Sequence, residues 1–241
     1  MKLRVIGSSS SGNCYLLENK QECLIIEAGE NPNKFSFDIE KVVGCLVTHE
    51  HKDHSKYAVE FQKMAIDIYA SQGTIQETGL KGHRLKVIKA LKKFYIGNFA
   101  VLPFNVKHDA AEPLGFLIQH PEMGTLLFAT DTYYLENRFA GLNHVMIECN
   151  YDNEILSENM LQGKVPKTVR DRTLASHMSI ETCVNFLNSN DLTNVFNIVL
   201  IHLSSQNSNK RAFKEAVSRA TGKEVYISSK GLELELNKDI F

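Results

Sequence analysis

Histidine and aspartate side chains are concentrated in one short stretch of the sequence, VTHEHKDHS, residues 47–55. His49 and His51 are two positions apart, so in an extended segment both side chains point to the same side. Asp53 and His54 follow where the chain should turn into a helix, and an adjacent pair there can project in different directions. The stretch can therefore offer two ligands to one metal ion and two to a neighbouring ion.

The ligand types narrow the choice of metal. Imidazole nitrogen and carboxylate oxygen at this density suit Zn²⁺, and also Mn²⁺ or iron. The ordinary alternative is a solvated loop that happens to be rich in histidine. Random clustering rarely gives HxHxDH directly after a buried strand, so the sequence favours a metal site with zinc as its first candidate.

Three more candidate ligands stand where other apolar runs end. His108 follows FAVLPFNVK, Asp131 follows TLLFAT, and His202 lies near the end of NIVLIHL. Strand ends of this kind are where a shared cleft is built. Taken singly, each residue has an ordinary alternative: a surface loop residue, a turn former and a hydrogen-bonded core histidine, in that order.

The elements that must position these residues follow from apolar periodicity. Strands are expected at 3–7, 13–18, 23–29, 42–48, 66–70, 99–106, 115–119, 125–130, 144–149, 197–203 and 232–236. Helices are expected at 55–64 behind a Ser55 cap, and at 72–78, 153–161, 180–187 and 208–220. Many strands follow one another as in hairpins, which favours packed sheets with helices outside over a purely parallel sheet.

No linker divides the chain, so we expect a single domain over residues 1–241. The least regular stretch is 162–176, QGKVPKTVRDRTLAS, which we expect to be a lid or loop that borders the site.

Composition and charge limit the partners and the cellular compartment that can be expected for this protein. With a formal charge of −1, the chain is not expected to grip nucleic acid over its whole surface, although a local basic patch is compatible with that charge. No apolar run reaches about 18 residues and the amino terminus is too polar for a secretory signal, so no membrane span is expected. The five cysteines include no CxxC pair, which indicates a reducing, cytoplasmic setting without disulfides.

These motifs resemble a known family. THEHKDH, KHDA, ATDT after an apolar strand, and LIHLS occur in the order and spacing of the metallo-β-lactamase fold superfamily. The match is closer to the YycJ-like (WalJ-like) branch of that superfamily, through GSSSSGNCYLLE, ECNYD, RDRTLASHMS and HLSSQN.

The resemblance implies an α/β fold, a four-layer αββα sandwich with a dinuclear metal site on one edge. It assigns His49, His51 and His108 to one ion. It assigns Asp53, His54 and His202 to the other, with Asp131 bridging. It also implies that His177, in an SH[ST]-like position, lies beside the scissile phosphate, where it could donate a proton to the leaving oxygen. The alternative for His177 is a histidine near a helix cap without a catalytic role.

Two positions depart from the family pattern. Glu27 stands in IIEAG where the family usually has aspartate, which puts its support of the metal loop in doubt. Tyr151 stands where the branch tends to have histidine, so no role of that histidine can be carried over.

The chemistry expected of such a site is hydrolysis. Two divalent ions about 3.5–4 Å apart activate a water and clamp the oxygens of an in-line displacement, and Asp53 could help orient or deprotonate that water. Phosphodiesters are favoured by His177, by the absence of a cysteine ligand, and by basic residues that could follow a nucleic acid backbone. These are Lys81, Arg84, Lys86, Lys89, Lys92, Lys93, Lys107, Lys164, Lys167, Arg170 and Arg172. The ordinary alternative for any one of them, a residue on the solvated outer face of a strand or loop, fits the sequence at least as well.

Three functional hypotheses follow. The first is a dinuclear metal-dependent phosphodiesterase that acts on nucleic acid, with a DNA exonuclease as its first form. The resemblance to the YycJ-like branch implies the same activity. The second is a small-molecule hydrolase on the same fold, which cleaves a cyclic phosphodiester, thioester or lactone. The third, a non-enzymatic binding protein, is disfavoured because buried ligating groups without metal would repel one another. The sequence does not fix the oligomeric state.

Overall fold

The structure is a computed structural model that describes residues 1–238. Its internal contacts divide the chain into two compact units. The first unit consists of Met1–Asn105, Ala110–Thr125 and the residues from Ser229 onward, and the second of Val106–Asp109 and Leu126–Ser228. The prediction of a single domain over residues 1–241 stays a prediction.

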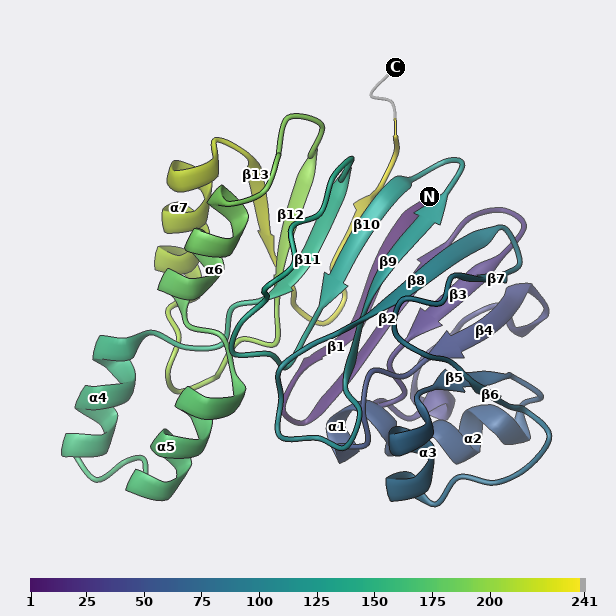
Figure 1. Ribbon diagram of the computed structural model, residues 1–241, viewed down its shortest axis with the longest axis horizontal. Coiled ribbons are helices and arrows are strands. Elements are labelled where there is room, and N and C mark those ends of the chain that lie inside the picture. Colours follow the sequence, from purple (N-terminus) through teal and green to yellow (C-terminus); the bar gives the residue numbers. More distant parts are fainter. Residues whose placement is uncertain (239–241) are drawn as a thin grey trace. The chain divides into compact units, whose positions relative to one another are not determined.

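The first unit contains a mixed sheet of seven strands, counted over the described residues (Figure 1). In sheet order they are β14 (Glu233–Glu235), β1 (Lys2–Ser9), β2 (Gly12–Glu18), β3 (Cys23–Ile26), β4 (Val42–Leu46), β5 (Ile68–Ala70) and β6 (Leu85–Val87). The strands from β14 to β3 are antiparallel neighbours, whereas β3, β4, β5 and β6 run parallel. The segments that follow the parallel strands therefore lie along one edge, here called the carboxyl edge of the first sheet.

The remaining strands belong to a second mixed sheet. The first unit supplies an antiparallel meander of β7 (Phe94–Ile96), β8 (Phe99–Asn105) and β9 (Leu114–His120). The second unit contains a parallel run of β10 (Gly124–Ala129, from Leu126 onward), β11 (His144–Glu148), β12 (Asn197–Ile201) and β13 (Glu224–Ile227). All of β11 and nearly all of β12 are buried, as expected of strands that are apolar on both faces.

Short helices of the first unit follow its parallel strands: η1 (Pro32–Lys34), η2 (Ile39–Lys41), α1 (Lys52–Ser55), α2 (Ala58–Lys63) and α3 (Gln72–Thr78). The prediction of one helix over 55–64 with Ser55 as its cap is wrong. The Ser55 hydroxyl instead donates to the carbonyls of Glu50 and His51, at 2.7 and 3.1 Å. Ala28 then interrupts the helix, because its N–H donates to the His54 carbonyl and its carbonyl accepts from the Tyr57 N–H. Asp53 and His54 are consequently held inside one helical turn.

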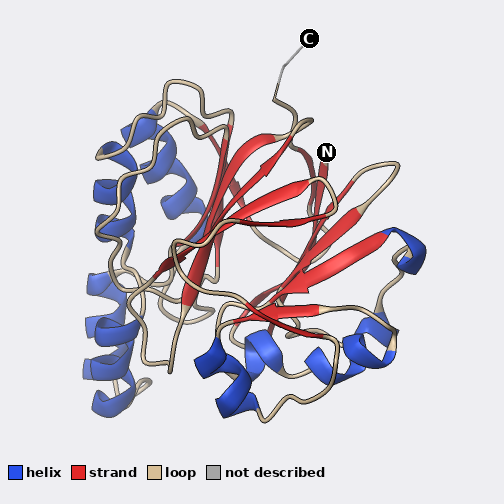
Figure 2. Ribbon diagram, turned by 45° about the vertical axis from the view of Figure 1, so that its right-hand side comes forward, coloured by secondary structure: helices blue, strands red, loops and turns tan. Residues whose placement is uncertain are grey.

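The second unit carries α4 (Asn153–Leu161), α5 (Lys167–Ser176), α6 (Ile180–Asn188) and α7 (Lys210–Thr221), drawn in blue in Figure 2. Helix α6 begins after the Ser179 cap, and α7 ends before Gly222, whose φ is 67°; both helices lie close to the predicted ranges 180–187 and 208–220. Two mixed sheets flanked by helices match the predicted αββα class, which is confirmed.

The prediction that residues 162–176 are an irregular lid or loop is wrong, because most of this stretch forms α5. Its sequence lacks a clear apolar stripe, so periodicity gives no helical signal. The helix packs through Leu174 onto a small cluster of Tyr151, Leu156 and Val165. An exposed ion pair between Lys167 and Asp171, which are four positions apart in the sequence, adds a small stabilisation to the helix; Nζ and Oδ2 lie 3.4 Å apart.

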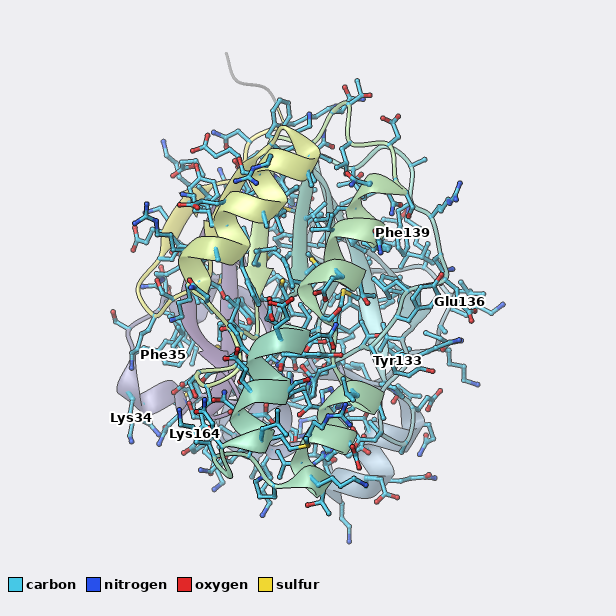
Figure 3. All side chains as sticks on the ribbon, turned by 90° about the vertical axis from the view of Figure 1, so that its left-hand side faces the viewer. Lys34, Phe35, Tyr133, Glu136, Phe139 and Lys164 are labelled. Atoms are coloured by element: carbon cyan, nitrogen blue, oxygen red, sulfur yellow. The ribbon has the colours of Figure 1, made fainter. Side chains whose placement is uncertain are left out.

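A long connection from β10 to β11 occupies residues 130–143 of the second unit. Figure 3 shows Tyr133, Glu136 and Phe139 along it. Phe139 is buried, and its N–H donates to Asn190 Oδ1 at 2.7 Å. The Tyr133 N–H donates to the Lys107 carbonyl at 3.1 Å, which fixes the start of the connection.

The structure bears on two expectations from composition, the state of the cysteines and the absence of a membrane span. All five cysteines are buried and none forms a disulfide. Within residues 1–238, no helix is both long enough and apolar enough to cross a membrane.

Candidate metal centre

The segment after β4 brings together the histidines of the HxHxDH motif. His49 Nε2 and His51 Nδ1 lie 3.1 Å apart, as expected if both side chains face the same side of an extended segment. His51 then serves as the N-cap of α1. In that helical turn, Asp53 Oδ2 lies 3.2 Å from His54 Nε2.

These spacings suit a metal ion. Two ligand atoms each about 2.0–2.1 Å from one tetrahedral ion lie about 3.3–3.4 Å apart. Two donor pairs of the motif are separated by 3.1 and 3.2 Å. His49 and His54 are buried, and His51 and Asp53 are half-buried. The donor set is that of a divalent metal site, as predicted from the residue types.

Glu27 fixes the orientation of two of these histidines, despite the longer side chain that put this support in doubt. Its Oε1 atom lies 3.2 Å from His54 Nδ1 and accepts from the Thr48 hydroxyl at 2.6 Å. Thr48 Oγ1 in turn lies 2.9 Å from Nδ1 of His49. With a proton on Nδ1 of both rings, each lone pair sits on Nε2, as a metal ligand requires. Glu27 makes these contacts from a left-handed backbone with φ 70°.

The glycine of the same IIEAG motif has a steric role. A Cβ atom at Gly29 would lie 1.8 Å from the Asp53 carbonyl oxygen. Only glycine allows the chain after β3 to approach α1 this closely.

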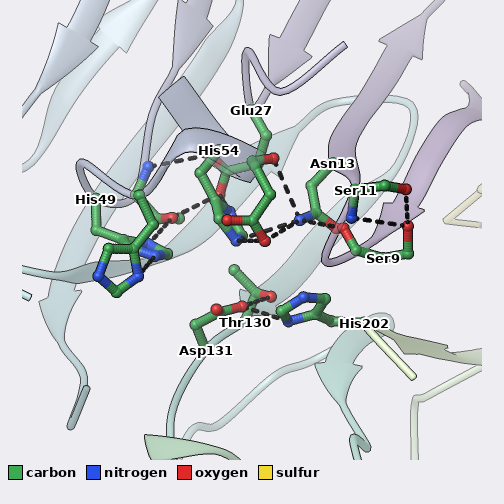
Figure 4. Close-up of polar contacts among 12 residues, drawn as sticks. Ser9, Ser11, Asn13, Glu27, His49, His54, Thr130, Asp131 and His202 are labelled. Atoms are coloured by element: carbon green, nitrogen blue, oxygen red, sulfur yellow. Dashed lines mark hydrogen bonds and ion pairs between the residues drawn. The ribbon is translucent and has the colours of Figure 1, made fainter. Parts of the chain in front are cut away.

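Asn13 is a contact residue of this site that sequence reasoning missed (Figure 4). It is fully buried at the start of β2, and its Nδ2 atom lies 3.3 Å from Asp53 Oδ2 and 3.2 Å from His54 Nε2. Its side chain also donates to the Ser9 carbonyl at 3.1 Å. The available signal was a polar residue that opens an otherwise apolar strand, NCYLLE.

In the second unit, Asp131 lies between two candidate histidine ligands. Its Oδ1 atom is 2.6 Å from His202 Nδ1, and its Oδ2 atom is 3.6 Å from His108 Nε2. His108 Nδ1 lies 2.9 Å from the Ser176 carbonyl, so it carries the proton and Nε2 carries the lone pair. Asp131 and His202 both have left-handed backbones, with φ of 45° and 52°. Non-glycine residues in that region are strained, and such strain is concentrated at functional positions.

Glu148, the last residue of β11, is a second residue that sequence reasoning missed. Its carboxylate is fully buried, and Oε1 lies 2.6 Å from His177 Nδ1 and 3.4 Å from His202 Nδ1. Its Oε2 atom accepts from the backbone N–H groups of Thr132 and Met178, at 2.8 and 3.3 Å. Asp131, Glu148, His177 and His202 form one group whose donor atoms all lie within 4.8 Å of one another. The sequence signal was available, because Glu148 ends an apolar strand as Asp131 follows one.

Burial and neighbouring charges shift the pKa values of three residues in the second unit. Burial by itself lowers the pKa of His177, but the charge of the Glu148 carboxylate and its hydrogen bond raise that pKa above the ordinary value. Burial by itself raises the pKa of Glu148, and the charge and hydrogen bond of His177 lower it. Burial lowers the pKa of His108, against the attraction of Asp131. His177 and Glu148 thus favour an imidazolium–carboxylate pair.

Tyr151, which stands where the branch pattern tends to have histidine, has a packing role in this structure. Tyr151 is buried in the cluster at the base of α4 and α5, and burial raises its pKa to about 12. Its neighbour Asn150 donates from Nδ2 to the His202 carbonyl at 2.8 Å, which helps to hold the left-handed backbone of that residue.

The predicted site residues are therefore found in two groups. His49, His51, Asp53 and His54 converge in the first unit. His108, Asp131, His177 and His202 converge in the second. Each group contains both imidazole and carboxylate donors.

Comparison with known proteins identifies the family. The family model described as "Beta-lactamase superfamily domain" matches residues 28–202. The chain is 29% identical over 237 residues to "Exodeoxyribonuclease YycJ" of Bacillus anthracis, which covers 89% of this chain and 87% of that protein. It is 28% identical over 230 residues to "Exodeoxyribonuclease WalJ" of Streptococcus pneumoniae, which covers 87% of this chain and 84% of that protein.

A solved structure gives the same fold. The metallo-β-lactamase fold protein YhfI from Bacillus subtilis superimposes with a TM-score of 0.75 at 17% identity, covering 97% of this chain and 99% of the other. The resemblance inferred from the motifs is confirmed, as is the prediction of a metal-dependent hydrolase. The chain belongs to the beta-lactamase superfamily.

Proposed function

We propose that this protein is a dinuclear metal-dependent phosphodiesterase that acts on DNA as an exonuclease. The observation that carries the proposal is the pairing of His177 with the buried Glu148, beside Asp131 and His202. This pair supplies a protonated imidazole next to candidate metal ligands, which a phosphodiester with a poor leaving group requires. The names of the two curated relatives, both exodeoxyribonucleases, support the substrate class.

The ligand assignment is part of this proposal. His49, His51 and His108 would hold one ion, and Asp53, His54 and His202 the other, with Asp131 bridging. The arrangement inside each unit supports it, since every one of these residues has a donor atom close to that of another. Zinc is the first candidate metal, and manganese or iron is also compatible with the donors.

When bound, two divalent ions lower the pKa of a water and neutralise charge on the phosphoryl oxygens. Asp53 accepts the proton of the attacking water, and Asn13 orients the Asp53 carboxylate through its amide. As the new bond from the water oxygen to phosphorus forms, the bond from phosphorus to the leaving oxygen breaks. His177 donates its proton to that leaving oxygen, and Glu148 stabilises the imidazolium beforehand.

Cleavage of end-labelled DNA tests the proposal. Single- and double-stranded substrates are incubated with the purified protein and Mn²⁺ or Zn²⁺, and again with chelator. The Asp53→Ala variant is compared with Asp38→Ala, which changes a carboxylate that caps the exposed 3₁₀ helix η2. Metal-dependent stepwise shortening that only Asp53→Ala abolishes is the expected result. Intact DNA from metal-loaded protein would contradict the proposal and favour small phosphodiesters, thioesters or lactones.

A further inference from the structure

A basic segment of the first unit reaches the same sheet edge as the HxHxDH motif. Strands β4, β5 and β6 are parallel neighbours, so the segments after β4 and β6 both lie at the carboxyl edge of the first sheet (Figure 1). His49 follows β4 and Lys89 follows β6. Two inter-strand spacings separate β4 from β6, about 10 Å. Whatever reaches the motif can therefore extend over the segment that begins at Lys89.

The three lysines at the start of this segment carry positive charge that no carboxylate pairs with in the part of the chain that the structure describes. Residues 79–108 contain no aspartate or glutamate. Arg84 and Lys86 are paired with Asp67, at 2.9 and 3.4 Å. Lys89, Lys92 and Lys93 are exposed, and within residues 1–238 none of the three forms an ion pair. A surface of this kind attracts a polyanion.

Two large side chains are exposed beside these lysines in the sequence. Leu91 and Tyr95 are each 69% exposed. Lys93 Nζ lies 5.6 Å from the centre of the Tyr95 ring, so a cation already rests against the aromatic side chain. Aromatic rings beside lysines are the common platform for unpaired bases in single-stranded nucleic acid.

The backbone of Leu91 is strained, and this strain brings no burial in return. Its φ is 62°, in the left-handed region that disfavours leucine, and its N–H donates to the Pro103 carbonyl at 2.8 Å. Glycine would adopt this turn without strain. A leucine that is both strained and exposed contributes little to folding, which indicates a role in contact with a ligand.

We propose that Lys89, Leu91, Lys92, Lys93 and Tyr95, here called the Lys89–Tyr95 surface, bind single-stranded DNA. This inference rests on the proposed function and specifies where the substrate strand is held beyond the cleavage site. The three lysines contact backbone phosphates. Leu91 and Tyr95 contact the faces of unpaired bases, which duplex DNA does not offer.

Binding is measured by fluorescence anisotropy with a labelled oligothymidylate, in chelator so that cleavage does not interfere. Changing all three lysines to alanine is expected to weaken binding at least 10-fold at low salt. It should also reduce the slope of log affinity against log salt by about 2, since each phosphate contact in single strands contributes about 0.7. The matched control changes Lys20, Lys34 and Lys230, which are exposed elsewhere in the first unit, and should leave the slope unchanged.

Two further variants separate contact from stability. Tyr95→Ala should weaken binding by about 5-fold or more, whereas Tyr95→Phe keeps the ring and should bind like the wild type. Leu91→Gly should keep or raise the thermal midpoint, because it relieves the left-handed strain, and yet weaken DNA binding. Wild-type affinity in the lysine and Tyr95→Ala variants, or equal losses in the control triple variant, would overturn the inference.

The two proposals fail in different ways. If the protein cuts DNA but the lysine and Tyr95→Ala variants bind DNA like the wild type, the proposed role of the Lys89–Tyr95 surface is wrong and the nuclease proposal stands. If the protein binds DNA through this surface but never cuts it in the presence of metal ions, the nuclease proposal is wrong and the proposed binding surface stands. Equal affinity for duplex and single strand would contradict the assignment of Leu91 and Tyr95 to unpaired bases.

Discussion

The Glu148 carboxylate lies 2.6 Å from His177 Nδ1, and both groups are held by the second unit alone. The pair leaves His177 Nε2 as the proton donor that the proposed reaction needs. His177→Ala should lower kcat by about 10²–10⁴-fold on ordinary DNA, with a smaller change in KM. Turnover on a p-nitrophenyl phosphodiester of thymidine should fall far less, because that leaving group needs no proton. Equal losses on both substrates would show that His177 does not act as the acid.

The pH profile tests the electrostatic role of Glu148. Because Glu148 raises the pKa of His177, the imidazolium persists to higher pH than it otherwise would. In Glu148→Gln the limb of kcat/KM that falls with rising pH should therefore move to lower pH. Single-turnover rates between pH 5 and 9 would reveal this shift, and an unmoved limb would contradict the role of the pair. Glu181→Gln, an exposed carboxylate at the start of α6, is the matched control.

Glu27 is expected to act through the metal ligands. It contacts His54 directly and reaches His49 through Thr48. Glu27→Gln should weaken metal binding by about 10–100-fold, the usual cost of losing such a support. Competition with a chromogenic chelator measures this affinity. Glu22→Gln removes another buried carboxylate of the first unit, and it should leave metal affinity unchanged.

The number of ions can be counted against single ligands. Wild-type protein loaded with Zn²⁺ should hold two ions per chain by elemental analysis after gel filtration. His54→Ala should hold about one, because the other ion keeps its own histidines. Metal should also raise the thermal midpoint of the wild type more than that of the variant, since binding stabilises only the folded state. A wild-type content of one ion would contradict the dinuclear proposal.

The sequence predicted the strand ends better than the side chains that support them. His49, His51, Asp131 and His202 follow or end apolar runs, a pattern that local periodicity reveals. Asn13 and Glu148 meet their partners only through tertiary contacts between segments far apart in the chain. Their places at strand ends could mark both residues as candidates, but no spacing rule in a single sequence shows which residues they contact.

Local signals also failed where tertiary packing determines the backbone. Helix α5 has no strong apolar stripe and depends on a cluster with Tyr151 and Leu156. The left-handed backbones of Glu27, Asp131 and His202 are uncommon for residues other than glycine, although aspartate and histidine adopt this region more often than most. Such strain persists only where surrounding structure imposes it, so propensity alone could not predict it.

Glu22 provides a test of stability away from the metal ligands. Its buried carboxylate accepts from the Asn98 backbone N–H at 2.9 Å, from Asn98 Nδ2 at 2.8 Å and from His120 Nε2 at 2.9 Å. Burial alone raises the pKa of Glu22, but these hydrogen bonds lower it below the ordinary value. The stabilisation is therefore present above the unfolded pKa of about 4.3 and is lost as pH falls through the lower, folded value.

Glu22→Gln should lower the free energy of unfolding at pH 7 by about 1.5–3 kcal/mol, as expected for hydrogen bonds to a charged group. The loss should shrink as pH falls below about 4.3, because the wild type then loses the same charge. Urea unfolding at pH 7 and at pH 3.5 measures both values. Gly97→Ala should also destabilise the fold, since its Cβ would lie 2.1 Å from Glu22 Oε2 and its φ is 55°. An equal loss for Glu22→Gln at both pH values would show that packing, and not the carboxylate charge, stabilises this contact.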